Sequence, residues 1–433
     1  MKGWGGYPIV SANVFRPERV GDLIGIINRV KGTYLARGAG TSYGDASINN
    51  EGLNIDMRRL NKMFHFDAIS GVLHCQSGVV LQDIIKTFLR KGWFLHVTPG
   101  TQRATVGGCV ACDAHGKNWK GGSFHNCVTG LRLMLYDGSI IYCDANENSD
   151  IFVATCGGMG MTGIILDVHL KLKKISSSYM DVEAIRFSNL EELFELQKAS
   201  LDSHEYLFSW LDTHKEGESM GRGILQRANH CVDGDLQYKE KRRVSLPFHM
   251  PNLTVNKYSV VAFNHIYYAM ARNDDKSRLH LNDFFYPLDG FANWYKIYGK
   301  KGFIEYQVVI PTDQAYETIF ELLRTITKSK LGSTIAAVKP LIQSDGLMSF
   351  PMDGFTLAVD FIRSGSLWDL LDKLDKIVIA SGGKVYLAKD ARLSEESFRT
   401  MYSNSLDKWE LIREKYGVRD GFKSMMFNRI LSS

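Results

Sequence analysis

The chain has 433 residues, which is long enough for two or three domains and a sizeable core. Its composition, 45% hydrophobic and 23% charged, is that of an ordinary globular protein, and a net charge of +5 is too small to indicate nucleic-acid binding. No run reaches the roughly 18 apolar residues of a membrane-spanning helix, and the first residues lack the apolar segment of a signal peptide. Seven cysteines, an odd number, are typical of a reduced cytoplasmic protein.

The first part of the chain mixes helical and strand-like patterns up to the break at Ser176-Ser177-Ser178. Apolar spacing predicts helices over 19–31 and 80–93, and strands over 33–36, 53–57 and 163–173. Asp137-Gly138 marks the turn of a hairpin over 131–142.

The middle of the chain continues with longer alternating segments. We expect strands over 180–187, 206–212, 303–310 and 355–361, and helices over 190–201, 314–328 and 368–379. The stretch 231–290 is the least regular part, and we expect mobile loops there.

Three glycine-rich stretches are the strongest signals. The first, Arg37-Gly38-Ala39-Gly40-Thr41-Ser42-Tyr43-Gly44-Asp45, follows a strand-like run, and such a turn can present backbone N–H groups to an anion. Its spacing is not that of a Rossmann motif, and no long helix follows directly. On its own, this stretch is equally consistent with a plain loop. Two further small-residue stretches, over 98–118 and 157–165, suggest one large cofactor held by the backbone.

The motifs in these stretches resemble a known family. R-G-x-G-x-S-Y-G-D, P-G-T-x-x-x-T-V-G-G and G-G-x-G-x-T-G-I resemble the FAD-binding domain of the vanillyl-alcohol-oxidase superfamily. C-D-x-H-G-K-N resembles one branch, the decaprenylphosphoryl-β-D-ribose oxidase family, the flavin half of a sugar epimerase. The resemblance covers nearly the whole chain. It implies an α+β, two-domain PCMH-type (vanillyl-alcohol-oxidase-like) flavoenzyme: an FAD-binding domain over 1–176, an antiparallel-sheet substrate domain over 177–383, and a C-terminal return to the FAD-binding domain over 384–433, carried by a helix over 395–415.

The resemblance also implies the cofactor contacts. The expected FAD-binding residues are Ala36, Arg37, Gly38, Ala39, Gly40, Thr41, Ser42, Tyr43, Gly44, Asp45, Gly100, Thr105, Val106, Gly107, Gly108, Cys112, Asp113, His115, Ile165 and Tyr386. Thr41 stands where related enzymes carry a linking histidine, and no cysteine lies between Cys75 and Cys109, so we expect non-covalent FAD. Tyr43 is expected against the flavin, although a tyrosine that caps the core would look the same.

Oxidation of an alcohol by a flavin requires a base for the hydroxyl proton and fixed groups that hold the substrate. His115 and Lys117 would face one side of an extended segment, and a nearby cation would keep His115 unprotonated. With Lys389, which would stabilise the reduced flavin or bind substrate hydroxyls, they are the predicted catalytic residues. The alternatives are a satisfied histidine and a surface lysine. Cys109-x-x-Cys112 before His115 lacks a second ligand pair, so packing is favoured over redox or metal roles, and we expect no metal.

The resemblance assigns the substrate pocket and its differences from the family. The expected substrate-binding residues are Tyr43, Lys117, Trp210, Phe285, Gln307, Lys339 and Lys389. Phe285 stands where the family has tyrosine, Glu305 where it has glutamine, and Ala358 where mycobacterial-type members have cysteine. These differences concern the substrate more than the chemistry.

The resulting hypothesis is an FAD-dependent oxidoreductase that converts a secondary hydroxyl of an activated sugar, polyprenyl-phosphate-linked by resemblance, to a ketone. This is the first half of a two-enzyme epimerisation in cell-envelope glycan synthesis. Expected partners are a lipid-linked or nucleotide-linked sugar and a separate NAD(P)H-dependent short-chain reductase. We expect a cytoplasmic protein that touches the inner face of the membrane through the charged run 239–243 with Phe248 and Met250, unless that run is simply solvated.

Two rival functions stay open. One is an FAD-dependent oxidase or dehydrogenase of a free polyol or aldonolactone. The other is a flavoprotein without catalysis that acts as a scaffold or electron carrier, against which the joint presence of His115, Lys117 and Lys389 argues.

Overall fold

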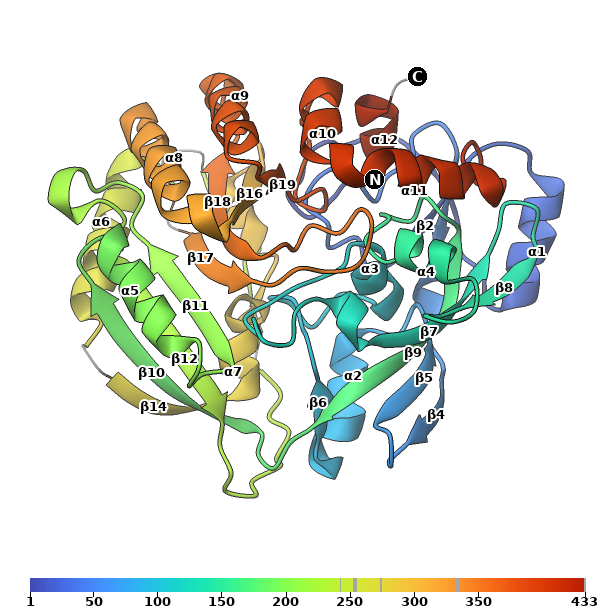
Figure 1. The fold of residues 1–433 in the computed structure, drawn as a ribbon, viewed down its shortest axis with the longest axis horizontal. Helices are drawn as coiled ribbons and strands as arrows, with labels where there is room; N and C mark the ends of the chain where they lie inside the picture. The colour runs from blue at the N-terminus through green and yellow to red at the C-terminus, as the bar shows by residue number, and fades with distance from the viewer. Residues whose placement is uncertain (242, 252–254, 273–274, 332, 334, 432–433) are drawn as a thin grey trace.

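The structure is a computed structural model that describes residues 1–433 except 242, 252–254, 273–274, 332, 334 and 432–433. Two sheet-based halves lie side by side, the later one carrying a large sheet backed by helices and the earlier one holding most of the first 176 residues (Figure 1). One continuous hydrophobic core runs through both halves, so they are packed against each other rather than linked by a flexible hinge.

The first half contains two sheets. Its strands are β1 (Asn13–Phe15), β2 (Tyr34–Arg37), β3 (Leu53–Asp56), β4 (Met63–Asp67), β5 (Val72–Gln76), β6 (Trp93–Leu95), β7 (Val128–Met134), β8 (Ile140–Cys143) and β9 (Ile164–Lys174). Its helices are α1 (Val20–Arg29), α2 (Leu81–Phe88), α3 (Val106–Ala111) and α4 (Ser149–Thr155). A parallel sheet has the order β1-β3-β2, and a six-stranded antiparallel sheet has the order β4-β5-β9-β7-β8 with β6 added on β9.

The second half is built on one antiparallel sheet of eight strands in the order β14-β10-β12-β11-β17-β18-β16-β19. Its strands, with the separate pair β13-β15, are β10 (Tyr179–Phe187), β11 (Tyr206–Leu211), β12 (Gly223–His230), β13 (Val244–Ser245), β14 (Asp275–His280), β15 (Phe291–Ala292), β16 (Phe303–Pro311), β17 (Ala336–Leu341), β18 (Gly354–Ile362) and β19 (Lys384–Val385). Its helices are α5 (Leu190–Ser200), α6 (Lys257–Met270), α7 (Leu281–Phe285), α8 (Ala315–Ser329) and α9 (Gly365–Ala380). Helices α5, α8 and α9 cover its outer face (Figure 1).

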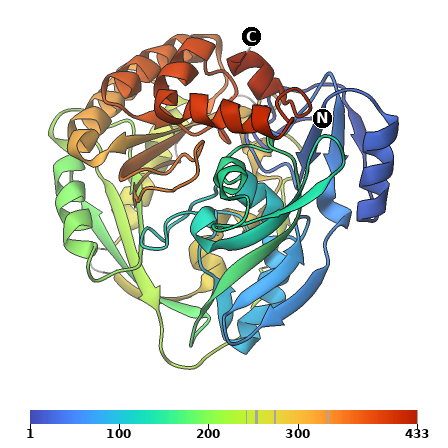
Figure 2. The same ribbon diagram turned by 45° about the vertical axis from the view of Figure 1, so that its right-hand side comes forward.

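The chain ends on the first half. The helices α10 (Glu395–Met401), α11 (Ser403–Lys415) and α12 (Met425–Ile430) run along the top of the molecule and reach the early strands (Figure 2). The indole N–H of Trp409 donates to the Ala154 carbonyl at 3.0 Å, and the Tyr34 N–H donates to the Gly421 carbonyl at 2.8 Å. The C-terminal segment therefore closes the FAD-binding half. Strand β19, just beyond the expected limit at 383, still pairs with β16.

Most expected elements are confirmed. The helices and strands expected before 176, the hairpin at Asp137-Gly138, and every strand and helix named between 180 and 379 are present with ends shifted by a few residues. The predicted fold class, an α+β flavoenzyme with an antiparallel-sheet substrate domain, is also confirmed.

Three expectations were wrong in detail. The helix over 80–93 is α helix only to Phe88; it continues as a 3₁₀ turn over Leu89–Lys91 and stops there, because Gly92 takes a left-handed conformation and Trp93 begins β6. The helix over 395–415 is two helices, because buried Tyr402 turns inward and donates to the Val385 carbonyl at 2.8 Å. The stretch 231–290 is not wholly irregular, since it contains α6, β14 and α7. Its mobility stays a prediction.

Candidate active site

A cavity of about 460 Å³ is lined by residues from both halves, a size typical of a ligand site. All three glycine-rich stretches reach it. The expected cofactor-binding residues on its wall are Ala36, Gly38, Ala39, Gly40, Thr41, Ser42, Tyr43, Gly100, Thr105, Gly107, Gly108, Cys112, His115, Ile165 and Tyr386. The sequence prediction thus gathers these side chains and backbone segments correctly in one place, while their contact with FAD stays a prediction.

Five expected cofactor residues do not line the cavity but support its wall. Arg37 donates to the carbonyls of Ser47 at 2.5 Å and Lys2 at 2.8 Å. Asp45 forms an ion pair with Arg429 of α12 at 3.0 Å. Val106 is fully buried, Gly44 packs against the Asp390 backbone, and Asp113 accepts hydrogen bonds from the His125 N–H and the Ser344 hydroxyl. These residues therefore position the cofactor segments rather than face the open space.

Glycines shape the cofactor end of the cavity. A Cβ on Gly38 would lie 2.1 Å from the Thr105 hydroxyl oxygen, and one on Gly107 would lie 2.6 Å from the Ser77 Cβ. Gly107 has no positive φ, so close packing and not backbone conformation requires glycine there. Gly100 also lines the cavity, and a Cβ there would meet nothing within 4 Å. The glycine wall, with the buried Ser77 hydroxyl that has no partner among the described residues beside Gly107, fits a large cofactor that approaches the backbone.

His115 lies at the junction of the cofactor and substrate ends. Its Nε2 is 2.8 Å from the Gln307 amide nitrogen, a contact that requires an unprotonated Nε2 when the amide donates. Among the described residues its buried Nδ1 has no hydrogen-bond partner. Burial, and secondarily the charges of Lys339 and Lys389, holds the pKa of His115 well below its usual range. His115 is therefore neutral and available as a base. The sequence suggested Lys117 as the cation that keeps His115 unprotonated, but the charges that lower its pKa are those of Lys339 and Lys389.

Two lysines line the cavity without forming an ion pair among the described residues, although the charge of Glu305 partly offsets the lowering of the Lys339 pKa. Lys117 donates to the Phe284 carbonyl at 2.5 Å and lies 4.2 Å from the centre of the Phe284 ring. Burial, and secondarily Lys339, lowers the pKa of Lys117 to about 7, and burial is also the first cause that lowers the pKa of Lys339 to about 8. Neither forms an ion pair with a carboxylate in the described part of the chain. An anionic group of a ligand in the cavity would be attracted to both lysines.

Lys389 does have an acidic partner. Its Nζ lies 2.9 Å from a Glu305 carboxylate oxygen and 3.5 Å from the centre of the Tyr43 ring. Glu305 pairs across the sheet with Asp360, so two carboxylates are neighbours on the cavity wall. Burial, and secondarily Glu305, raises the pKa of Asp360 well above its usual range, and the Tyr298 hydroxyl donates to Asp360 at 3.1 Å. Asp360 is therefore protonated beside the ion pair of Lys389 and Glu305.

Asp360 is a cavity residue that sequence reasoning missed. A signal for it existed, because Asp360 follows Ala358 by two positions in β18 and strand alternation places both on one face. The expected substrate residues Tyr43, Lys117, Phe285, Gln307, Lys339 and Lys389 line the cavity. Trp210 does not line it, but its ring lies 4.8 Å from that of Tyr267, which does. Substrate contact by these residues stays a prediction.

The state of the cysteines favours a packing role over a redox or metal-binding role. All seven are free, and burial raises the pKa of Cys112 to about 11 and that of Cys109 well above its usual range. Both thiols are therefore protonated at neutral pH, which disfavours a redox or metal-ligating role.

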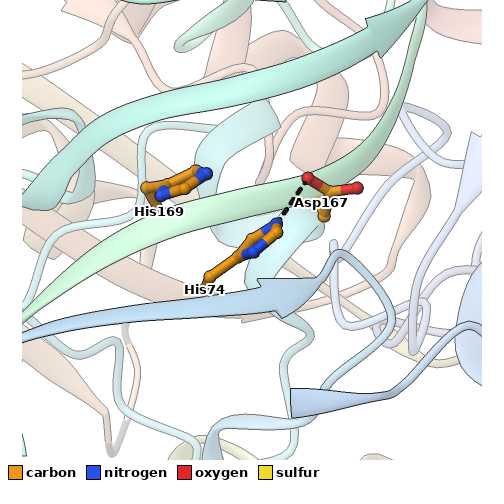
Figure 3. Close-up of side chains that lie close together, drawn as sticks. All are labelled: His74, Asp167 and His169. Carbon is orange, nitrogen blue, oxygen red and sulfur yellow. Dashed lines mark hydrogen bonds and ion pairs between the residues drawn. The ribbon is translucent and has the colours of Figure 1, made fainter. Parts of the chain in front are cut away.

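Among the described residues, the only three grouped as metal ligands are His74, Asp167 and His169, whose ligand atoms lie within 4.8 Å of one another (Figure 3). Both Asp167 oxygens already accept hydrogen bonds from the Arg132 guanidinium, and one also contacts His74 Nε2 at 2.9 Å. The guanidinium charge against the carboxylate opposes a second cation, so we interpret the group as a polar network of the sheet.

The comparisons with known proteins match this arrangement. The sequence pattern of a family described as "FAD binding domain" matches residues 11–144, which include the first two glycine-rich stretches up to β8. The fold and the site define an FAD-dependent oxidoreductase of the PCMH type. No described helix has both the length and the apolar character needed to cross a bilayer.

Similar proteins of known name show to which family of these oxidoreductases the chain belongs. The chain is 32% identical to decaprenylphosphoryl-β-D-ribose oxidase of Mycolicibacterium smegmatis over 92% of this chain and 88% of that protein. It is 27% identical to an uncharacterised protein of Streptomyces coelicolor over 81% of this chain and all of that protein, and 27% identical to mouse L-gulonolactone oxidase over 42% and 41% of the two chains. The chain belongs to the decaprenylphosphoryl-β-D-ribose oxidase family.

Proposed function

We propose that the enzyme oxidises a secondary hydroxyl of a polyprenyl-phosphate-linked pentose to a ketone, as the first half of an epimerisation that serves cell-envelope glycan synthesis. A separate NAD(P)H-dependent short-chain reductase would reduce the ketone from the opposite face. The name of the mycobacterial relative, which acts on a decaprenylphosphoryl ribose, supports the substrate class.

One observation in the cavity carries the phosphate part of this proposal. Lys117 and Lys339 face the cavity with lowered pKa values and without a carboxylate partner among the described residues. The charge of Lys339 lowers the pKa of Lys117, so the two cations repel each other. A phosphate diester would supply a negative charge that favours the protonated form of both lysines. A neutral polyol or lactone would add no negative charge to that of Glu305, which acts on Lys339 but not on Lys117.

The chain's own residues supply the acid–base chemistry. Bound FAD would accept the hydride from the carbinol carbon. His115, neutral and unprotonated at Nε2, would take the hydroxyl proton at that atom when the substrate hydroxyl replaces the Gln307 amide as its hydrogen-bond donor. Lys389 and Glu305 would bind neighbouring hydroxyls, one as donor and the other as acceptor. The enclosed cavity orients the sugar and limits water near the reacting carbon.

Anaerobic bleaching of the flavin tests this function. The holoenzyme would be mixed with farnesylphosphoryl-β-D-ribofuranose, with a nucleotide-linked pentose, with free ribose, and with an aldonolactone. We expect bleaching by the prenyl phosphate alone, with the keto sugar found by mass spectrometry. Bleaching by the free sugar or the lactone at equal or higher rate would instead favour the polyol or aldonolactone oxidase, and no bleaching by any compound would favour the non-catalytic flavoprotein.

The earlier proposal of a membrane contact through 239–243 finds little support in the contacts of that run. Lys241 pairs with Asp283 at 3.1 Å, Glu240 pairs with Lys86 at 2.9 Å, and Lys239 lies over the Tyr179 ring. Residue 242 is outside the described residues. Phe248 is exposed, whereas Met250 is half-buried. These charges are mostly engaged by the protein itself, which leaves the contact to be sought on another surface.

A further inference from the structure

Helix α6 is the most apolar exposed surface that the structure describes. Between Tyr258 and Met270 it has no acidic residue, no lysine and no arginine. Tyr258 is 83% exposed and Met270 is 77% exposed, and four further large side chains of the helix are also exposed: Val261, Phe263, Ile266 and Tyr267. A soluble monomer rarely presents so many large apolar side chains on one element without a partner.

The helix is firmly attached on its other side. Val260 and Asn264, one helical turn apart, are its buried positions. The Asn264 amide donates to the Asp212 carboxylate at 3.0 Å and to the Ser333 carbonyl at 3.1 Å, and the Arg222 guanidinium lies 4.4 Å from the Tyr268 ring centre. The exposed face is therefore held outward by polar anchors. It cannot simply turn its apolar side chains into the core.

The apolar face continues into the cavity. Tyr267 lines the cavity and is also partly exposed on the surface. Its ring stacks on that of Phe263, one turn earlier, with centroids 5.8 Å apart and planes 7° from parallel. A hydrocarbon chain that leaves the cavity past Tyr267 would therefore meet Phe263 and the rest of this face. No other described helix combines a cavity-lining side chain with such an exposed apolar face.

We propose that the exposed face of α6 docks on the hydrocarbon boundary of a lipid bilayer and brings the cavity mouth to a lipid-linked substrate. This inference rests on the proposed function, since a polyprenyl chain stays in the bilayer while its sugar is oxidised. A helix that lies in a membrane interface inserts a face of aromatic and aliphatic side chains into the lipid, and the exposed face of α6 carries such side chains. Tyrosine at the ends of such a face suits the region between headgroups and acyl chains. The enzyme would lie on the bilayer, with α6 at its surface.

Vesicle sedimentation tests the docking surface. The holoenzyme would be spun with vesicles of phosphatidylcholine and phosphatidylglycerol, as wild type and as the triple variant Phe263→Ser, Ile266→Ser and Met270→Ser. Loss of three apolar side chains should weaken vesicle binding by about tenfold or more. The matched control is Ile69→Ser, an exposed side chain (97%) on the β4–β5 turn of the other half, which should bind as wild type. Equal binding of the triple variant and the wild type would overturn the proposal.

A second measurement does not depend on the triple variant folding. Six of the native cysteines are buried, so a single cysteine at Met270 can carry an environment-sensitive fluorophore with Ile69→Cys as the control position. We expect a blue shift with vesicles at position 270 only. No shift at 270, or concentration-dependent dimers in which the fluorophore is shielded without vesicles, would overturn bilayer docking.

The substrate assay separates this inference from the proposed function. Methylphosphoryl ribose, which has no hydrocarbon chain to meet Phe263, should be oxidised by the triple variant at the wild-type rate, whereas the same variant should lose activity on decaprenyl-linked substrate in vesicles. Oxidation of both by the variant at wild-type rates contradicts docking and leaves the proposed function intact. Failure of wild type on both substrates contradicts the proposed function itself.

Discussion

The two ends of the cavity are built in different ways. At the cofactor end the wall is backbone: three loops of small residues, with Gly38 and Gly107 packed too closely for any side chain. At the substrate end the wall is side chains from the eight-stranded sheet, among them Gln307, Lys339 and Asp360. The first end depends on chain conformation and the second on charge and hydrogen bonding.

This difference explains what each end tolerates. If the backbone wall contacts the cofactor, as predicted, changes there should act through packing and folding. If the side-chain wall contacts the substrate, as predicted, changes there should act on chemistry and specificity. The departures from the family pattern, Phe285, Glu305 and Ala358, all lie at the substrate end. The following predictions test whether the two ends can be separated by mutation.

The largest expected effect is at the substrate end. His115→Ala removes the proposed base, and loss of a positioned acid–base group typically lowers turnover by about 10²–10⁴-fold. The control is His249→Ala, a histidine that does not line the cavity. Steady-state turnover with farnesylphosphoryl ribose checks this prediction. A variant with turnover within about twofold of wild type would mean that another group accepts the proton.

The next effect is at the cofactor end. Gly107→Val would drive a branched side chain against Ser77, and overpacking of this kind typically costs about 1–3 kcal/mol. We expect lower flavin content and a lower melting temperature. Gly365→Val is the matched control, because a Cβ at Gly365 meets nothing within 4 Å. Full flavin occupancy with unchanged melting would show that the close approach at Gly107 is not needed.

The third effect is a pH dependence of stability. The pKa of Lys117 is about 7 in the folded protein and 10.5 in its ordinary state, so between these values the unfolded chain binds more protons. Stability should therefore rise with pH through this window, and the cost of burying the charge is fully present below pH 7. Lys117→Met should remove about 2 kcal/mol of the gain between pH 7 and 9, measured by urea unfolding of the substrate-free holoenzyme.

The control for that experiment is Lys408→Met, an exposed position on α11 where no such change is expected. A Lys117→Met variant with the wild-type pH profile would show that Lys117 is not buried as a cation in solution.

The smallest expected effect is on the flavin potential. Lys389 is the cation predicted to stabilise reduced flavin, and Glu305 partly neutralises it at 2.9 Å. Lys389→Ala should lower the potential and Glu305→Gln should raise it, each by an amount on the order of 20–40 mV. Redox titration with a reference dye measures both. Shifts of the same sign in both variants would contradict the pairing of these two residues at the flavin.

Much of the cofactor end could be predicted from sequence, because its signal is local. The loops 37–45, 98–118 and 157–165 carry their glycines in consecutive motifs, and all three line the cavity. The sequence motifs did not distinguish the residues that line the cavity from the residues that support its wall. Asp45 and Arg37 stand in the same motif as Gly38, but their partners lie outside it. Asp45 pairs with Arg429, and Arg37 donates to the carbonyls of Ser47 and Lys2.

The substrate end was less predictable, because it depends on strand pairing. The neighbourhood of Glu305 and Asp360 follows from the register of β16 on β18, which sequence pattern alone does not fix. The regular structure inside 231–290 was missed because α6 lacks the usual alternation of apolar and charged positions. A helix with apolar residues on its exposed side gives no clear amphipathic signal.

The separation of the two ends is tested most directly by the rate of anaerobic flavin reduction per bound flavin, measured by stopped flow with farnesylphosphoryl ribose. For Gly107→Val we expect reduced occupancy but a near wild-type rate in the molecules that retain flavin. For His115→Ala we expect full occupancy and a rate about 10²–10⁴ times slower. Slow reduction per flavin in Gly107→Val, or loss of flavin in His115→Ala, would contradict the division of the cavity into a backbone-built cofactor end and a side-chain-built chemical end.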